Sequence, residues 1–102
     1  MAILGKFTKQ PVEVLDYQFD FTDWLADRSD TISGTPIVVS VPLTAGAANL
    51  TISSISTALG IVRFFAAGGV DGASYEITCT FNTASSPART KQDEMVIKVK
   101  ET

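Results

Sequence analysis

Five aspartates recur every three or four residues in the first third of the chain, and their carboxylates are the groups best suited to chemistry. They are Asp16, Asp20, Asp23, Asp27 and Asp30. Closely spaced carboxylates suit calcium, but the stretch lacks the D-x-D-x-D-G loop with a later glutamate that binds this ion. Two carboxylates across a cleft can hydrolyse a glycosidic bond, yet a chain of 102 residues seldom builds the groove that this reaction needs. We therefore interpret the aspartates as a solvated edge that faces a partner.

The composition removes most other catalytic chemistry. The chain contains no histidine, which excludes Ser-His-Asp catalysis, Cys-His catalysis and metal ligation by imidazole. Cys79 is the only cysteine, and its place between two threonines in a strand-like run predicts a small buried hydrophobe rather than a nucleophile. We expect a protein that is not an enzyme and that holds no cofactor or metal.

The charge pattern narrows the classes of partner. The net charge is −3 and the eight lysines and arginines are dispersed, which argues against a nucleic-acid partner because phosphate binding needs clustered cations. The longest uncharged run, residues 31–62, is broken by serine, threonine, glycine and proline, so it does not predict a membrane span. The first residues lack the regions of a signal peptide, and we expect synthesis in the cytosol.

The stretch that carries the aspartates is predicted to be a strand with one buried and one wet face. Apolar side chains alternate with polar ones: Leu15, Tyr17, Phe19 and Phe21 against Asp16, Gln18 and Asp20. A period of two is typical of a β-strand. After this strand, Trp24 and Leu25 are expected to form a single helical turn and to fold back on its apolar face.

Further strand patterns follow, separated by turn residues. They are residues 31–41 with interruptions at Gly34 and Pro36, a strand from Leu50 with a shift of parity near Ile55, and the runs Ile61–Ala67, Tyr75–Phe81 and Glu94–Lys100. Pro36 and Pro42 bracket the run Ile37–Val41, which favours an edge strand or a strand that switches sheets, because proline lacks a backbone donor. The apolar run Ile61–Ala67 is predicted to be a central strand.

The number and spacing of these strands predict the fold class. About seven short strands without a long helix indicate an all-β domain, which we predict to be a small Ig-like antiparallel β-sandwich. A closed barrel is the structural alternative. Residues 1–10 have a mixed composition and end at Pro11, so we predict an N-terminal arm over residues 1–10 and a single sandwich domain over residues 11–102.

Two motifs resemble a known family. The first reads K-x-P-x-E-x-x-D-Y-x-x-D-F-x-x-W-L from Lys9 to Leu25, followed by Asp30-Thr31-Ile32, and the second reads G-G-x-x-G-x-x-Y-x-I-x-C from Gly68 to Cys79. Together with the last strand, they are similar to a family of small bacteriophage and prophage virion proteins described as fiber-tail adaptors. The resemblance extends over nearly the whole chain.

The resemblance implies a structural protein of the virion without enzymatic activity. Such a protein would be made in the cytoplasm of the bacterial host and would attach fibers or spikes to the tail or neck through protein contacts. Its partners would be tail, fiber, neck or capsid subunits, and several copies would be present in each particle. Two alternatives stay open: a decoration protein of the capsid, and a module that binds carbohydrate or a host surface through Trp24 and Tyr17.

We predict that the partner contacts come from two segments, the N-terminal arm and the small-residue loop at residues 44–49. An arm or strand edge can add to the sheet of a neighbour, and repeated copies multiply weak contacts. The predicted partner-binding residues are Ile3, Leu4, Lys6, Phe7, Lys9, Ala45, Ala47 and Asn49.

Overall fold

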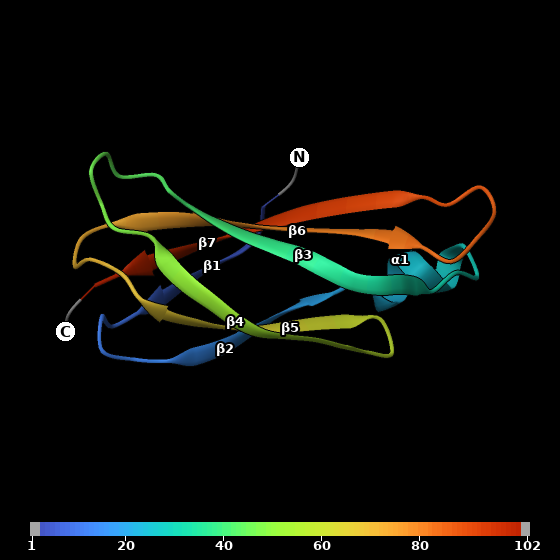
Figure 1. Cartoon of the computed structure of the whole chain (residues 1–102), viewed down its shortest axis with the longest axis horizontal. Helices are drawn as coiled ribbons and strands as arrows, with labels where there is room; N and C mark the ends of the chain where they lie inside the picture. Colours follow the sequence, from blue (N-terminus) through green and yellow to red (C-terminus); the bar gives the residue numbers. More distant parts are fainter. Residues whose placement is uncertain (1–2, 101–102) are drawn as a thin grey trace.

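The computed structural model describes residues 3–100, and the side chains of residues 7–100. These residues form seven strands and one short helix, which Figure 1 shows as an elongated pair of layers with the helix at one end. The elements are β1 (Ile3–Lys9), β2 (Leu15–Asp20), α1 (Thr22–Asp27), β3 (Ile32–Pro42), β4 (Leu50–Ala58), β5 (Ile61–Gly68), β6 (Ser74–Thr83) and β7 (Thr90–Val99).

The strands form two separate sheets. One sheet has the order β1-β7-β6-β3 and the other has the order β2-β5-β4. Neighbouring strands are antiparallel except β1 and β7, which run parallel. The all-β sandwich that the sequence predicts is therefore confirmed. Strand β3 lies at the edge of its sheet, which confirms the position predicted from Pro36 and Pro42. Strand β5 is the middle strand of the other sheet, which confirms the central position predicted for Ile61–Ala67.

The segment predicted as an arm over residues 1–10 contains a strand. Residues Ile3–Lys9 are strand β1, which pairs with β7 at the edge of the larger sheet. The pairing continues beyond the strand, because the Lys100 backbone N–H donates to the Lys9 carbonyl at 2.8 Å. The edge of β7 offers unpaired backbone groups, and β1 satisfies them. A mixed sequence does not reveal such a partner. Residues 1–2 lie outside the described part.

The strand that carries the first aspartates has the predicted two faces. Tyr17 and Phe19 are buried, and the three polar residues between and beside them are exposed. The short helix α1 begins where the Asp20 carboxylate accepts hydrogen bonds from the Thr22 backbone N–H at 2.9 Å and from the Thr22 hydroxyl at 2.6 Å. Leu25 is buried, whereas Trp24 is only partly buried and packs at the margin of the core.

Irregular positions interrupt two of the strands where the sequence predicts them. The register between β3 and β6 shifts between Ser33 and Ile37, around Gly34 and Pro36. The register between β4 and β5 shifts between Ser53 and Ser56, and Ser54 has a φ of 52°. Between Ser53 and Ser56, β4 has one residue more than β5, and this bulge moves the following side chains to the other face. Between Ser33 and Ile37, β3 has two residues more than β6, so the following side chains keep their faces.

The core lies between the two sheets and is built mainly from β5, β6 and β7. Alternate side chains of these strands are buried: Val62, Phe64 and Ala66 on β5, Tyr75, Ile77, Cys79 and Phe81 on β6, and Met95, Ile97 and Val99 on β7. Cys79 is a free thiol whose pKa rises to about 12 through burial and the nearby charge of Asp93. The thiolate is therefore disfavoured, and the predicted role of Cys79 as a buried hydrophobe is confirmed.

The last strand differs from its predicted start. It begins at Thr90, whereas the sequence pattern predicts a start at Glu94. The extra residues pair with the end of β6, where Thr90 lies opposite Asn82 and its hydroxyl donates to the Asn82 side-chain oxygen at 2.8 Å. Polar residues at this end form a strand because their backbone groups pair with β6. This pairing outweighs the weak β-strand propensity of polar residues.

Candidate protein-interaction surface

The residues predicted to form a docking arm lie on β1. The backbone of Ile3 and Lys6 pairs with β7, while the side chains of Ile3, Leu4 and Lys6 are outside the described part. Phe7 is 41% exposed, and its ring lies edge-on to Tyr17 with 5.4 Å between the ring centroids. Phe7 therefore covers the open side of the core between β1 and β2, and part of its ring is still accessible to a partner.

Lys9 is not accessible in this structure. Its side chain is only 1% exposed, and its ammonium donates to the carbonyls of Gly68 at 2.6 Å, Gln10 at 2.8 Å and Pro11 at 3.4 Å. Burial lowers the pKa of Lys9, and the charge of Glu13 acts in the opposite direction. Lys9 thus ties β1 to the end of β5, an intramolecular role where the sequence predicts a contact with a partner.

The small-residue loop between β3 and β4 contains the other predicted contacts. Ala45 is exposed, whereas Ala47 is partly buried and packs against the core. The Asn49 amide donates to the Ser40 carbonyl at 2.7 Å, and its oxygen accepts from the Ser40 hydroxyl at 2.7 Å and from the Leu50 N–H at 2.8 Å. Asn49 therefore connects β3 to β4, and Ala45 is the freer of the predicted loop contacts.

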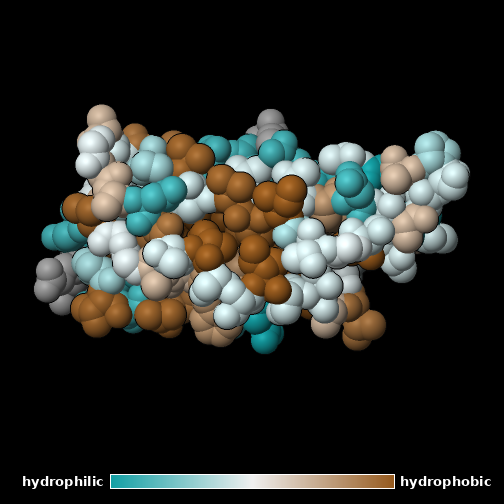
Figure 2. Space-filling view, viewed as in Figure 1, coloured by the Kyte–Doolittle hydropathy of each residue, from teal (hydrophilic) through white to brown (hydrophobic). Residues whose placement is uncertain are grey.

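The most prominent exposed feature is a row of aliphatic side chains along β3, which we call the β3 row. Its members are Ile37, Val39, Val41 and Leu43, with exposures of 63%, 47%, 49% and 56%. Figure 2 shows apolar side chains gathered near the middle of the face on which β3 and β4 lie. The side chains of Val38 and Ser40 point the other way and are buried.

Sequence reasoning misses the β3 row as a contact surface, although a signal is present. Ile37-Val38-Val39-Ser40-Val41 has apolar residues on both faces, which is typical of a strand that is buried on both sides. Two prolines at the same time favour an edge position for this strand. An edge strand with two apolar faces buries one face in the core of the domain and leaves the other face exposed to solvent.

The backbone edge of β3 offers little to an incoming strand. The Leu43 N–H donates to the Ser74 carbonyl at 2.8 Å, so alternate residues Val38, Ser40 and Pro42 turn their backbone groups to the open edge. Pro42 has no N–H, and the Ser40 carbonyl already accepts from Asn49. The side chains of the β3 row, rather than its backbone, are therefore the groups available for contact.

Polar residues of β6 border the β3 row on the same face of the sheet, and Glu94 of β7 lies beyond them. Thr80, Thr78 and Glu76 lie opposite Ile37, Val39 and Val41. A hydrogen bond with the Glu94 carboxyl raises the pKa of Glu76, with smaller contributions from burial and from the charge of Glu94. The apolar row thus ends at a polar border, as is usual for a protein interface.

Asp30, the last of the five aspartates, has a structural role. Its side chain is 3% exposed, and its carboxylate accepts from Arg89 Nη1 at 2.7 Å, from the Thr31 N–H at 2.9 Å and from the Ser85 N–H at 3.2 Å. Burial by itself raises the pKa of Asp30, but hydrogen bonds from Ser85, Thr31, Thr83 and Arg89 outweigh it and lower the pKa to about 2. Asp30 therefore joins the start of β3 to the connection between β6 and β7.

This network predicts a loss of stability in acid. The ordinary pKa of 3.8 falls to about 2 in the folded chain, so the stabilisation by Asp30 is complete above about pH 5 and is lost as the pH falls through about 2. We expect the melting temperature of Asp30→Asn to be lower at pH 5 and to fall less between pH 5 and pH 2. The exposed Asp27→Asn serves as the control and should follow the wild type. Parallel profiles for Asp30→Asn and the wild type would contradict the prediction.

The other aspartates form no metal site among the residues that the structure describes. No group of three or more histidine, cysteine, aspartate or glutamate side chains lies close enough to hold an ion there. Asp16 lies on the outer face of β2 and pairs with Arg63 at 3.7 Å, where both side chains are about half exposed. Across residues 3–100, no helix is long and apolar enough to cross a membrane.

A family comparison matches nearly the whole chain. The sequence model of the family described as "Podophage GP4 fiber-tail adaptor protein gp77" matches residues 9–98. The match includes β2 to β6, the helix, and β7 except its last residue, whereas of β1 it includes only Lys9. No curated protein gives a significant match.

Proposed function

The chain belongs to the podophage GP4 fiber-tail adaptor family gp77, and on this basis we propose that it joins a fiber to the tail of a virion by binding a protein on each side. Proteins of this family are structural adaptors. We also propose that the chain is part of the virion, that each particle contains several copies of it, and that it is made in the cytoplasm of the host.

The observation that carries the proposal is the β3 row on an elongated β-sandwich. Four neighbouring aliphatic side chains are about half exposed, and such patches on soluble proteins mark sites of protein interaction. The molecule measures 45 × 22 × 19 Å along its principal axes, so its two ends can contact different neighbours. A sheet face that is held by a packed core presents these side chains with little loss of conformational entropy on binding.

The predicted contact residues are part of the proposal. Leu43 leads directly into the loop that carries Ala45, so a neighbour seated on the β3 row also reaches this loop. Phe7 lies at the opposite edge of the larger sheet, on β1. We propose that it contributes to a separate contact, together with Ile3, Leu4 and Lys6.

The carbohydrate alternative receives no support from the positions of the two aromatic rings. Tyr17 is only 9% exposed. The guanidinium of Arg28 lies 4.6 Å and the ammonium of Lys91 lies 5.4 Å from the centroid of the Trp24 ring. Arg28 and Lys91 therefore already cover the Trp24 ring that would stack on a sugar. Cations over an aromatic ring are favourable contacts, so a sugar would have to displace them.

The proposed function is tested by expressing variants of the chain from a separate gene copy during virion assembly. Val39→Lys places a charge in the middle of the β3 row, where the side chain is 47% exposed, and we expect the melting temperature of the variant to stay close to that of the wild type. We expect the amount of chain in purified virions, measured by immunoblot, to fall at least tenfold. Thr51→Lys, on an exposed position of the other sheet, is the matched control and should leave it unchanged. Normal incorporation of Val39→Lys would contradict the role of the row. Absence of the wild-type chain from the fiber-tail junction in electron cryomicroscopy images would refute the function.

A further inference from the structure

We infer that the turn between β4 and β5, together with the pocket beside it, is a second docking site, and that it takes a partner surface with an apolar hollow and a basic rim. This inference rests on the proposed function, because an adaptor needs a second contact away from the β3 row. The site lies at the end of the sandwich that carries α1, which Figure 1 shows opposite the chain's C-terminus.

Leu59 at the tip of this turn is exposed and has an unfavourable backbone conformation. Its side chain is 95% exposed, and its φ is 51°. Ala58 pairs with Ile61, so Leu59 and Gly60 form a two-residue turn, and both have positive φ. Turns of this kind favour Asn-Gly, and the left-handed region is unfavourable for a leucine because its Cβ crowds the following carbonyl oxygen. Among the residues that the structure describes, Leu59 is too exposed for any packing contact to explain a leucine here, whereas a partner that buries the side chain does.

The turn is held firmly against the start of α1. The Phe21 N–H donates to the Gly60 carbonyl at 3.0 Å. A Cβ atom at Gly60 would lie 3.1 Å from Leu25 Cδ1 and 3.3 Å from Thr22 Cγ2, so the backbone approaches the helix as closely as a glycine permits. The backbone at Leu59 is therefore held in one orientation, so little backbone freedom is lost when a partner covers the side chain.

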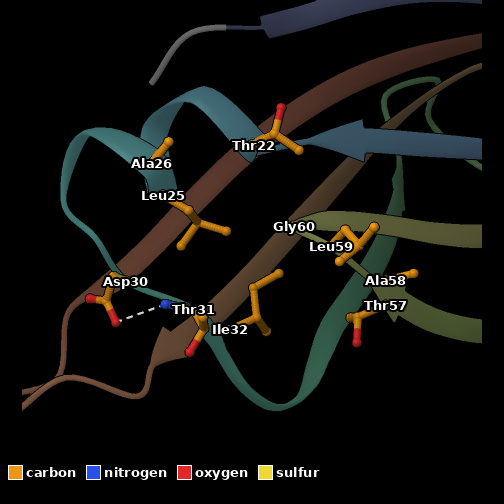
Figure 3. A pocket seen from close by; sticks show the side chains of 10 residues that line it. All are labelled: Thr22, Leu25, Ala26, Asp30, Thr31, Ile32, Thr57, Ala58, Leu59 and Gly60. Atoms are coloured by element: carbon orange, nitrogen blue, oxygen red, sulfur yellow. Dashed lines mark hydrogen bonds between the residues drawn. The ribbon is translucent and has the colours of Figure 1, made fainter.

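A pocket of about 410 Å³ lies between the turn, α1 and the start of β3. Figure 3 shows Leu25 and Ile32 pointing into this space, with Leu59 and Gly60 on its other side. The remaining lining residues are Thr22, Ala26, Asp30, Thr31, Thr57 and Ala58. The pocket has an aliphatic floor and hydroxyl groups around it, which suits one aliphatic side chain of a partner.

Three exposed carboxylates on or next to α1, the helix that lines one side of the pocket, form an acidic rim at this end, and they indicate the charge of the partner. Asp20, Asp23 and Asp27 are exposed at this end, and within residues 3–100 no ion pair involves any of them. The nearby cations are engaged. Arg28 lies over the Trp24 ring and donates to the Trp24 backbone carbonyl at 3.2 Å, Lys91 lies over the same ring and pairs with Asp93, and Arg89 pairs with Asp30. A partner with basic residues complements this rim, whereas a second copy of the chain would bring further acid to it.

The exchange Leu59→Asn separates binding from stability. Asparagine tolerates the left-handed region better than leucine, so the melting temperature should stay the same or rise. At the same time the variant loses the side chain that enters the partner. Val12→Asn is the matched control, because Val12 is 85% exposed and lies on a different loop. We expect the control to change neither binding nor melting temperature.

The binding experiment uses the purified full chain against the purified tail and fiber proteins of the same virion, each immobilised in turn. Leu59→Asn should weaken binding to one of the two by at least tenfold and leave the other unchanged. Val39→Lys should weaken only binding to the other protein. The double variant Asp23→Asn/Asp27→Asn should weaken the contact that depends on Leu59 and reduce its dependence on salt.

Each other result overturns the inference. If Leu59→Asn binds both proteins as the wild type does while Val39→Lys fails on one of them, the second site is wrong and the proposed function stands. If the wild-type chain binds neither protein, the proposed function and the second site are both wrong. If sedimentation shows a dimer of the wild type that Leu59→Asn abolishes, the occupant is a second copy rather than a basic partner.

Discussion

Replacement of Phe64 by alanine will lower the free energy of unfolding by about 3–5 kcal/mol, because the side chain is fully buried and the surrounding residues cannot close the cavity. Phe64 lies on the central strand β5, and its ring centroid is 5.9 Å from that of Tyr17 and 5.8 Å from that of Phe19. A domain of this size has about 5–15 kcal/mol of total stability. The exchange therefore removes a large part of it.

Urea unfolding measures this effect, and Phe65→Ala provides the matched control. Phe65 is the next residue on the same strand, points to the opposite face and is only partly buried. We expect Phe65→Ala to cost about 1–2 kcal/mol, less than Phe64→Ala, because it leaves no enclosed cavity. Equal losses for the two variants would show that the core does not lie between the sheets as described.

Replacement of Lys9 by methionine will lower the free energy of unfolding by about 2–3 kcal/mol, because buried carbonyls then lose a charged donor. The methionine keeps the length of the side chain and removes the ammonium. The Gly68 carbonyl, which accepts from Lys9 at 2.6 Å, is the most affected. β1 and the end of β5 should also loosen, which faster amide hydrogen exchange in β1 would report.

Lys98→Met is the control for Lys9→Met. Lys98 is exposed on β7, and removal of its charge should change the stability by no more than about 0.5 kcal/mol. If Lys9→Met proves as stable as the wild type or more stable, the removal of the ammonium from water outweighs its hydrogen bonds, and the structural role that we assign to Lys9 is wrong.

Most of the fold can be predicted because periodicity reports local burial directly. The alternation around Tyr17 and the alternation from Tyr75 to Phe81 both match the buried faces of the strands that form there. Even the change of parity near Ile55 corresponds to the bulge at Ser54. These features depend on which side of a strand is apolar, and that information is present in neighbouring residues.

Trp24 shows what this kind of reasoning leaves open. The sequence predicts that Trp24 folds back on the apolar face of the first strand, and Trp24 does pack against the core, but it is only partly buried and meets Phe81 edge-on with 6.1 Å between ring centroids. Its position depends on how α1 lies across the end of β6. Such an arrangement between distant segments leaves no trace in the spacing of residues around Trp24.

The candidate sites depend even more on distant contacts. Lys9 and Asn49 are polar residues in segments that look solvated, yet they bind the carbonyls of Gly68 and Ser40. The exposed face of Ile37, Val39 and Val41 arises because no strand or helix of the described chain covers it. The exposure of Leu59 in an unfavourable conformation follows from a two-residue turn that only the register of β4 and β5 defines.

Composition, a period of two and a sequence motif are enough to predict the all-β class, the buried face of most strands, the inert cysteine and the family. The tertiary structure alone decided that the first segment is a strand of the sheet, that Lys9 and Asp30 are buried in hydrogen bonds, and that β3 and Leu59 expose apolar side chains. The physical reason is that a side chain's burial and its hydrogen-bond partners are set by segments far away in the chain. The spacing of its neighbours reports only which way it points.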